Sequence, residues 1–145
     1  MEENIRTIQE IEADVVEEFS MFDEWLDKYE YIIELGKSLE AIEESDKNDG
    51  NLINGCQSRV WLVCGEEEGR LRFKADSDAI ITKGIISLLI KVYDNQKPED
   101  ILASDFSFIE KIGLKENLSP TRAGGLLAMI KQIKLYALAF QTKEQ

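Results

Sequence analysis

Residues 58–75 read SRVWLVCGEEEGRLRFKA, and this stretch indicates the fold class more clearly than any other part of the chain. The run 58–64 is rich in β-branched and aromatic residues, while the run 70–75 alternates between cationic and apolar residues, as a half-buried strand does. The five residues between the two runs, GEEEG, favour a turn. We therefore predict an antiparallel hairpin. Its second strand has a cationic and an apolar face, formed by Arg70, Arg72 and Lys74 and by Leu71, Phe73 and Ala75.

Helical patterns precede this hairpin. Residues 2–19 repeat apolar side chains at steps of three and four, which predicts a surface helix with one buried stripe. Ser20 is a candidate N-cap for a second helix, which carries the apolar side chains of 25–35, and Gly36 either ends this helix or lies in a turn. Leu39 and Ile42 indicate a further short helical stretch.

Helical patterns also follow the hairpin. Asp76-Ser77-Asp78 offers N-cap side chains to a helix over 79–94, which is apolar around most of its circumference and should be the central helix. A short helix begins at 98–101, and 106–109 forms an irregular apolar patch. The last helix, 119–140, opens on a Ser-Pro pair that suits the N-cap and first helical positions. The order helix, helix, hairpin, helix, helix predicts an α+β domain with a small antiparallel sheet.

The amino-acid composition excludes several classes of function. The chain has 145 residues, which suits one domain, and it carries 17 basic and 29 acidic residues for a net charge of −12. It contains no histidine, which excludes a Ser-His-Asp triad, a Cys-His pair and most catalytic zinc sites. Because phosphate binding depends on Lys and Arg, the charge argues against nucleic acid or an anionic membrane as the main partner.

The cysteines and the N-terminus indicate the cellular compartment in which we expect the protein. Two cysteines, Cys56 and Cys64, are too few for a disulfide-stapled secreted domain, and their spacing fits neither a CxxC pair nor a zinc quartet. No apolar run approaches the ~20 residues that a membrane span needs. The acidic start MEENIRTIQE lacks the apolar core of a signal peptide. We therefore expect a cytoplasmic protein, in a reducing compartment where a thiol stays free.

Cys56 is the candidate reactive residue. It follows Asn54-Gly55, where glycine can take a positive φ and make a sharp turn, and the polar segment 43–51 before it reads as a loop. A thiol on such a loop can be presented to a partner, although a small packed hydrophobe is the alternative. Cys64 ends a strand and is expected to pack. A disulfide between the two would need the loop to fold back, because a strand's length separates them.

Arg122 is the second candidate. It falls in the first turn of the last helix, where the helix dipole disfavours a cation by a few tenths of a kcal/mol. It could pair with an acidic residue, or it could stabilise a thiolate or persulfide anion brought near it. The following Gly124-Gly125 suggests close approach of another backbone segment. Asp76 and Asp78 could be general acids or partner contacts, although helix capping accounts for at least one of them. The segment GEEEG is expected to be a solvated turn and not a metal site.

Four ordered segments resemble one family. The sequence LINGCQSRVWL closely resembles the GCQSxVW signature of the SufE family of sulfur acceptors. This signature match lies at residues 52–62. Residues 31–36 are similar to the family's N-terminal helical motif, residues 76–84 to its DSDAxIxKG segment, and residues 118–130 to its LSPxRxxGLxxMI helix. Together the four segments fall within a span from about Phe22 to Ala139.

The resemblance implies a function and a fold. SufE-like proteins accept sulfane sulfur from a PLP-dependent cysteine desulfurase of the SufS or CsdA type, stimulate that enzyme, and carry the sulfur as a persulfide to an iron–sulfur scaffold of the SufBCD type. The implied fold is α+β, with a curved antiparallel sheet packed against helices, similar to the IscU scaffold. The implied domain is single, spanning 1–145, with an extra N-terminal helix over 1–19 that the resemblance does not cover and a core over 20–140.

The resemblance also implies the site residues. Cys56 is the persulfide acceptor, on a loop that can tuck its thiol against apolar residues and swing out on docking. Gly55, Gln57, Asp78 and Arg122 are supporting or partner-contact residues, whereas Cys64 lies outside the motif. The chain itself needs no cofactor, since PLP is expected on the desulfurase. We hypothesise that Arg122 and the helix start at Ser119 help to hold Cys56 in its anionic form.

Three alternatives stay open. A CsdE-type acceptor would feed a different sulfur pathway. An IscU-like scaffold would need several ligating thiols or imidazoles, which this chain lacks. A non-catalytic interaction domain would use Cys56 only for packing.

Overall fold

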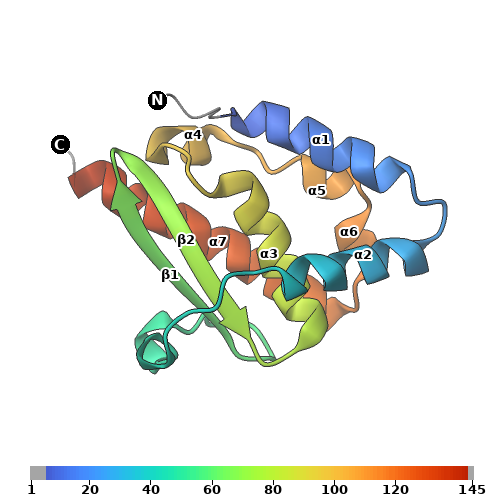
Figure 1. The fold of residues 1–145 in the computed structure, drawn as a ribbon, viewed down its shortest axis with the longest axis horizontal. Coiled ribbons are helices and arrows are strands. Elements are labelled where there is room, and N and C mark those ends of the chain that lie inside the picture. The colour runs from blue at the N-terminus through green and yellow to red at the C-terminus, as the bar shows by residue number, and fades with distance from the viewer. Residues whose placement is uncertain (1–5, 144–145) are drawn as a thin grey trace.

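The predicted hairpin is present in the computed structural model, which describes residues 6–143 (Figure 1). Strands β1 (Val60–Glu67) and β2 (Arg70–Ser77) pair antiparallel. The predicted five-residue connection is wrong, because β1 continues until Glu67 pairs with Arg70. The turn is formed by Glu68 and Gly69 alone, with φ values of 54° and 80°. Two positive φ angles are what a type I′ turn requires, and that turn follows the twist of the strands.

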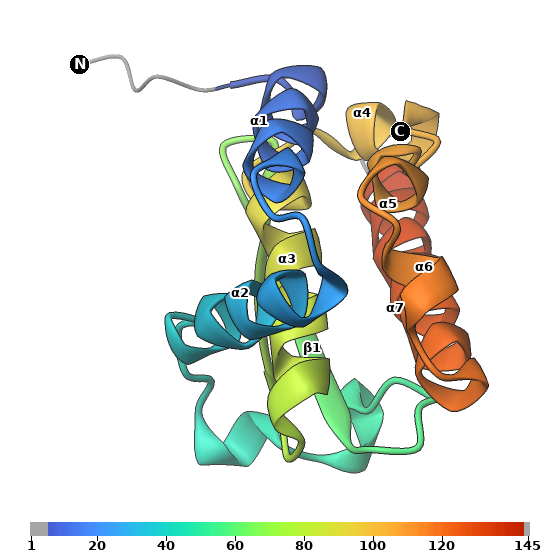
Figure 2. The same cartoon turned by 90° about the vertical axis from the view of Figure 1, so that its right-hand side faces the viewer.

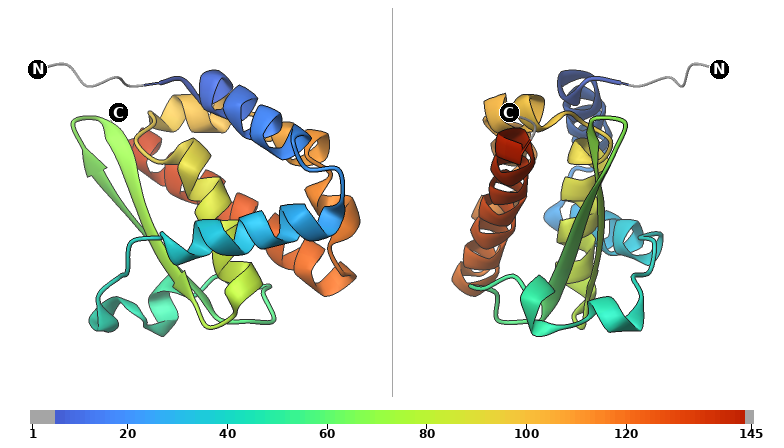
Figure 3. Two further views of the ribbon diagram at one scale, coloured as in Figure 1. Left: turned by 45° about the vertical axis from the view of Figure 1, so that its right-hand side comes forward. Right: turned by 90° about the vertical axis from the view of Figure 1, so that its left-hand side faces the viewer.

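The two faces of β2 differ as predicted. Leu71, Phe73 and Ala75 are buried, while Arg72 and Lys74 are exposed. Helix α3 (Ile80–Tyr93) packs directly against β2, and α7 (Pro120–Lys143) lies beside α3 (Figures 2 and 3). Tyr136 of α7 donates to the Leu62 carbonyl of β1. Burying these apolar side chains is the main stabilising contribution to such a fold. The confirmed fold class is therefore α+β.

Helix α3 is the central helix, as its all-round apolar pattern predicts. It contributes eleven buried residues to the core: Ile81, Thr82, Gly84, Ile85, Ile86, Ser87, Leu88, Leu89, Ile90, Val92 and Tyr93. The predicted capping by Asp76, Ser77 or Asp78 is wrong. The N-cap position is Ala79, which has no side-chain hydrogen bond, and Ser77 Oγ instead accepts from the Ala79 N–H at 3.2 Å.

Helix α2 (Trp25–Lys37) crosses α3 in direct backbone contact. A Cβ atom on Gly84 would lie 2.2 Å from the Ile32 carbonyl oxygen, and one on Gly36 would lie 2.8 Å from the Gly84 nitrogen. Ser87 Oγ donates to the Leu35 carbonyl at 2.8 Å across the same crossing. Gly36 therefore allows the two helices to cross closely. It lies inside the last turn of α2 and not in a turn between two elements.

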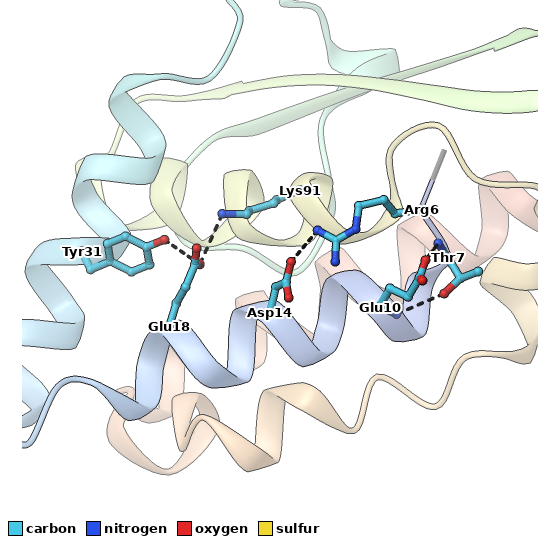
Figure 4. Close-up of polar contacts among 7 residues, drawn as sticks. All are labelled: Arg6, Thr7, Glu10, Asp14, Glu18, Tyr31 and Lys91. Atoms are coloured by element: carbon cyan, nitrogen blue, oxygen red, sulfur yellow. Dashed lines mark hydrogen bonds and ion pairs between the residues drawn. The ribbon is translucent and has the colours of Figure 1, made fainter. Parts of the chain in front are cut away.

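Helix α1 (Ile8–Ser20) begins with a capping box, in which Thr7 and Glu10 each accept from the other's backbone N–H (Figure 4). The predicted start at residue 2 lies outside the described residues. Ser20 does not cap α2; it is the last residue of α1, and its hydroxyl donates to the Glu17 carbonyl at 2.6 Å. Helix α2 begins instead after Glu24, without a side-chain cap.

Polar contacts join α1 to its neighbours. Glu18 Oε1 accepts from the Tyr31 hydroxyl of α2 at 2.8 Å and lies 3.4 Å from Lys91 Nζ of α3 (Figure 4). On the inner side, Ile8, Val15 and Phe19 are buried in the same core cluster as the hairpin and α3.

The connecting segments differ most from the sequence predictions. Residues 39–43 are not helical, contrary to expectation, and the polar loop contains two short 3-10 helices, η1 (Glu44–Asp46) and η2 (Asp49–Asn51). The short helix at Pro98 is present as α4 (Pro98–Ala103). The apolar patch that follows is more regular than predicted, with one-turn helices α5 (Phe108–Lys111) and α6 (Leu114–Asn117).

Helix α7 is longer and more apolar than the sequence patterns indicated. Over Pro120–Thr142 it meets the length and composition criteria for a membrane-crossing helix, with a mean hydropathy of 1.3, contrary to the expectation that no segment would. Four of its apolar side chains are fully buried in the core: Leu126, Met129, Ile133 and Ala137. A core helix meets the same criteria, so length and composition do not assign α7 to a membrane.

Candidate functional site

The Cys56 loop is fixed at both ends. It connects η2 to β1, and its base is closed where the Ile53 N–H donates to the Val60 carbonyl at 2.8 Å. Asp78 Oδ1 accepts from the Arg59 N–H at 3.1 Å, and the Asp78 N–H donates to the Arg59 carbonyl at 3.2 Å. Gly55 has a φ of 97°, which confirms the predicted sharp turn before Cys56. From this base the loop reaches across to the N-terminal end of α7 (Figures 2 and 3).

The thiol of Cys56 points inward. Its Sγ donates to the Gly125 carbonyl at 3.6 Å, and a Cβ atom on Gly125 would lie 3.5 Å from that sulfur. The close approach predicted for the glycine pair therefore occurs at Gly125, whereas Gly124 faces open space. Burial raises the pKa of the Cys56 thiol above its ordinary value. This position holds Cys56 as a protonated and shielded thiol.

A cavity of about 90 Å³ adjoins this sulfur. It is lined by Cys56, Gln57, Ser58, Thr82, Ile85, Thr121, Arg122, Gly125 and Met129. The structure thus brings together three of the residues proposed from the sequence: Cys56, Gln57 and Arg122. Asp78 is not in the lining, because its carboxylate closes the base of the loop instead.

Arg122 lies where the sequence predicts, in the first turn of α7. Its backbone N–H donates to Ser119 Oγ at 3.3 Å, which confirms Ser119 as the N-cap. Its guanidinium Nη1 donates to the hydroxyl of Tyr29 in α2 at 3.2 Å. Sequence reasoning missed Tyr29, because 93 positions separate the two residues and no local spacing indicates such a contact.

Asp76 joins the segment before the Cys56 loop to the hairpin. Its carboxylate lies 3.1 Å from Lys47 Nζ and 3.4 Å from Lys83 Nζ, with a side-chain exposure of only 14%. Lys47 also lies 5.8 Å from the ring centroid of Trp61, the cross-strand partner of Asp76. These contacts fix the connection between α2 and the Cys56 loop against the strands.

We predict that Asp76→Asn destabilises the fold in a pH-dependent way. Burial raises the pKa of Asp76, but the Lys47 and Ser77 hydrogen bonds and the Lys83 charge together lower it below its ordinary value. A carboxyl group whose pKa is lower in the folded state than in the unfolded state stabilises the fold at pH values above its unfolded-state pKa. This contribution is lost as the pH falls through the folded-state pKa. Denaturant unfolding should show a loss of about 1–2 kcal/mol at pH 7 that shrinks below about pH 4.

The matched control for this prediction is the exposed Asp23 of the connection between α1 and α2, where Asp23→Asn should change the free energy of unfolding by less than about 0.5 kcal/mol. A loss for Asp76→Asn that is equal at pH 7 and pH 3.5 would show that the ion pairs are not responsible.

Cys64 is placed differently from Cys56. It lies in β1 opposite Phe73, packs half-buried against the core, and is a free cysteine like Cys56. Burial, together with the negative charges of Asp94 and Glu66, raises its thiol pKa to about 12. Cys64 is therefore a packing residue, as expected, and is poorly suited to nucleophilic chemistry because only a thiolate attacks sulfur.

The fold and the site together define an α+β domain with a shielded thiol on a loop. A family model described as "SufE: Fe-S metabolism associated domain" matches residues 13–137. The chain is 39% identical over 125 residues to an uncharacterised SufE-like protein of Rhizobium etli, an alignment that covers 83% of this chain and 84% of that relative. The chain belongs to the SufE family, and membership implies a sulfur-transfer role in iron–sulfur metabolism.

A solved structure supports the fold. The solution structure of a hypothetical protein from Thermus thermophilus superposes with a TM-score of 0.76. The match covers 91% of this chain and 96% of the other, at 19% sequence identity. At that identity the comparison shows a shared fold and nothing about chemistry.

Proposed function

We propose that the chain accepts sulfane sulfur from a PLP-dependent cysteine desulfurase on Cys56 and carries it as a persulfide to an iron–sulfur assembly scaffold. The observation that carries this proposal is the placement of Cys56. Its thiol sits on a loop whose base is closed by hydrogen bonds, at a small cavity that Arg122 also lines. The match of residues 52–62 to the family's signature supports the same assignment.

The transfer is a thiol–persulfide exchange. The Cys56 thiolate attacks the outer sulfur of the donor's persulfide, a new S–S bond forms on Cys56, and the old S–S bond breaks. The donor cysteine leaves as a thiolate, the outer sulfur keeps its proton, and no outside oxidant or reductant is needed. Because burial raises the pKa of Cys56, we expect exchange only after the loop has turned the thiol away from Gly125.

The donor is a desulfurase of the SufS or CsdA type, which holds the PLP, and the recipient is a scaffold of the SufBCD type. A reducing compartment such as the cytoplasm would keep Cys56 free between transfers. The IscU-like alternative fits less well, because within residues 6–143 no three Cys, Asp or Glu side chains are grouped to hold a metal ion.

The proposal is tested by counting alanine, which is what remains of cysteine once its sulfur is removed. In the absence of reductant, a desulfurase stops when its own cysteine carries a persulfide. Adding this chain should raise the alanine yield by about one molecule per chain, because each Cys56 removes one sulfur and frees the enzyme. An alanine yield that does not depend on the chain would contradict the proposal.

A further inference from the structure

Arg122 is held by a phenol hydroxyl and not by a carboxylate, although the chain is acidic. The chain carries 29 acidic residues, and Arg6 and Arg72 pair with Asp14 and Asp94. Among the described residues Arg122 forms no ion pair, and its guanidinium donates instead to the Tyr29 hydroxyl at 3.2 Å. The guanidinium is thus held by a neutral group.

The difference between a phenol and a carboxylate matters for charge. A carboxylate would both hold the guanidinium and cancel its charge, whereas a hydroxyl accepts the hydrogen bond and leaves the charge available. The Tyr29 ring is half-buried and packs against the core, so the hydroxyl is a fixed point on α2. Tyr29 therefore orients Arg122 without neutralising it.

The residue that carries this charge shares a cavity with the reactive cysteine, since Arg122 and Cys56 line the same space of about 90 Å³. In the resting position the Cys56 S–H donates to the Gly125 carbonyl, and an anionic sulfur cannot make this bond, because it has no proton and faces the oxygen's lone pairs. A sulfur anion at this site needs a nearby positive charge, and Arg122 can supply it.

We infer that Tyr29 is a positioning residue, which holds Arg122 at the Cys56 cavity with its charge free to stabilise the sulfur anion. This inference rests on the proposed function and extends it to a residue in a different helix. Tyr29 is not among the residues that line the Cys56 cavity; it acts through Arg122.

The test is the pH dependence of Cys56 alkylation in the full chain. Trypsin cuts after Lys47, Arg59 and Arg70 and leaves Cys56 and Cys64 on separate peptides, so iodoacetamide labelling of Cys56 can be followed alone. The plateau rate at high pH reports access to the thiol, whereas the midpoint of the pH profile reports how well the thiolate is stabilised. A change in packing that exposes the thiol would raise the plateau and lower the midpoint, because burial raises the pKa of Cys56, whereas loss of the Arg122 charge raises the midpoint.

Tyr29→Phe removes only the hydroxyl and should shift the midpoint upward, with labelling at pH 7 slower by about threefold and an unchanged plateau. Arg122→Gln should cause the same or a larger shift, and Tyr29→Phe should add nothing in that background. The control is Tyr136→Phe, which removes a hydroxyl bonded to the Leu62 carbonyl and should leave the profile unchanged.

The inference is overturned if Tyr29→Phe keeps the wild-type midpoint or changes the plateau alone. It is also overturned if Tyr29→Phe shifts the midpoint as much in the Arg122→Gln background as it does in the wild-type chain. End-point loading by the desulfurase separates this failure from that of the proposed function. If Tyr29→Phe keeps the wild-type midpoint while Cys56 still takes up sulfur, only the inference about Tyr29 is wrong. If wild-type Cys56 takes up no sulfur, the proposed function is wrong.

Discussion

Gly84→Ala should destabilise the protein by about 3 kcal/mol or more, a large part of the 5–15 kcal/mol that holds a typical domain folded. The reason is the crossing of α2 and α3, where an added Cβ would lie 2.2 Å from the Ile32 carbonyl oxygen. This neighbour is backbone, so it cannot turn aside as a side chain can, and the two helices must separate. Chemical denaturation followed by circular dichroism measures the loss.

The matched control is Gly124→Ala, the same substitution in another helix. An added Cβ on Gly124 meets nothing within 4 Å, so the variant should be more stable by about 0.5–1 kcal/mol because alanine favours the helix. Equal effects of the two substitutions would contradict the role of the crossing, since helix propensity alone would then explain both.

Cys56→Ser should abolish the uptake of sulfur from the desulfurase while leaving the fold intact. Serine has nearly the shape of cysteine, and the half-buried site already faces a carbonyl acceptor, so the loop should keep its position. A hydroxyl cannot form the S–S bond that stores sulfane sulfur. With cysteine carrying radiolabelled sulfur, we expect labelled wild-type chain and unlabelled Cys56→Ser chain after gel filtration.

Cys64→Ser provides the matched control, because Cys64 is the other free cysteine and has a thiol pKa of about 12. This variant should accept sulfur as wild type does. Undiminished labelling of Cys56→Ser, or loss of labelling in Cys64→Ser with an intact fold, would show that Cys56 is not the acceptor.

The strands and main helices could be predicted from local patterns, because each pattern reflects burial of one face. In β2 the alternating apolar residues are the buried ones, and in α3 the apolar residues around most of the helix are buried. The hairpin turn could not be placed in the same way. GEEEG resembles a loop in composition, but cross-strand pairing such as that of Glu67 with Arg70 extends the sheet to a two-residue turn.

Caps were harder to predict than helices, because a hydroxyl has several nearby acceptors. Ser20 bonds back to the Glu17 carbonyl of its own helix, whereas Ser119 caps α7 as predicted. The difference is the following residue: Pro120 fits the first helical position after Ser119, and no such residue follows Ser20.

The candidate site was only partly accessible from the sequence. Cys56 and Arg122 stand out by their local context, a turn and a helix start. Their shared cavity and the hydroxyl of Tyr29 depend on how α2, α7 and the loop pack, which no spacing in the chain encodes. The inward direction of the Cys56 thiol likewise becomes visible only with the Gly125 carbonyl in place.

The most direct test is the mass of the tryptic peptide 48–59 after incubation of the chain with a cysteine desulfurase and cysteine, without reductant. We expect this peptide, which contains Cys56, to gain about 32 daltons, the mass of one sulfur atom, and to lose it on treatment with a thiol reductant. The peptide 60–70, which contains Cys64, should keep its mass. An unmodified 48–59 peptide, or the added mass on 60–70 instead, would contradict the assignment of Cys56 as the sulfur carrier.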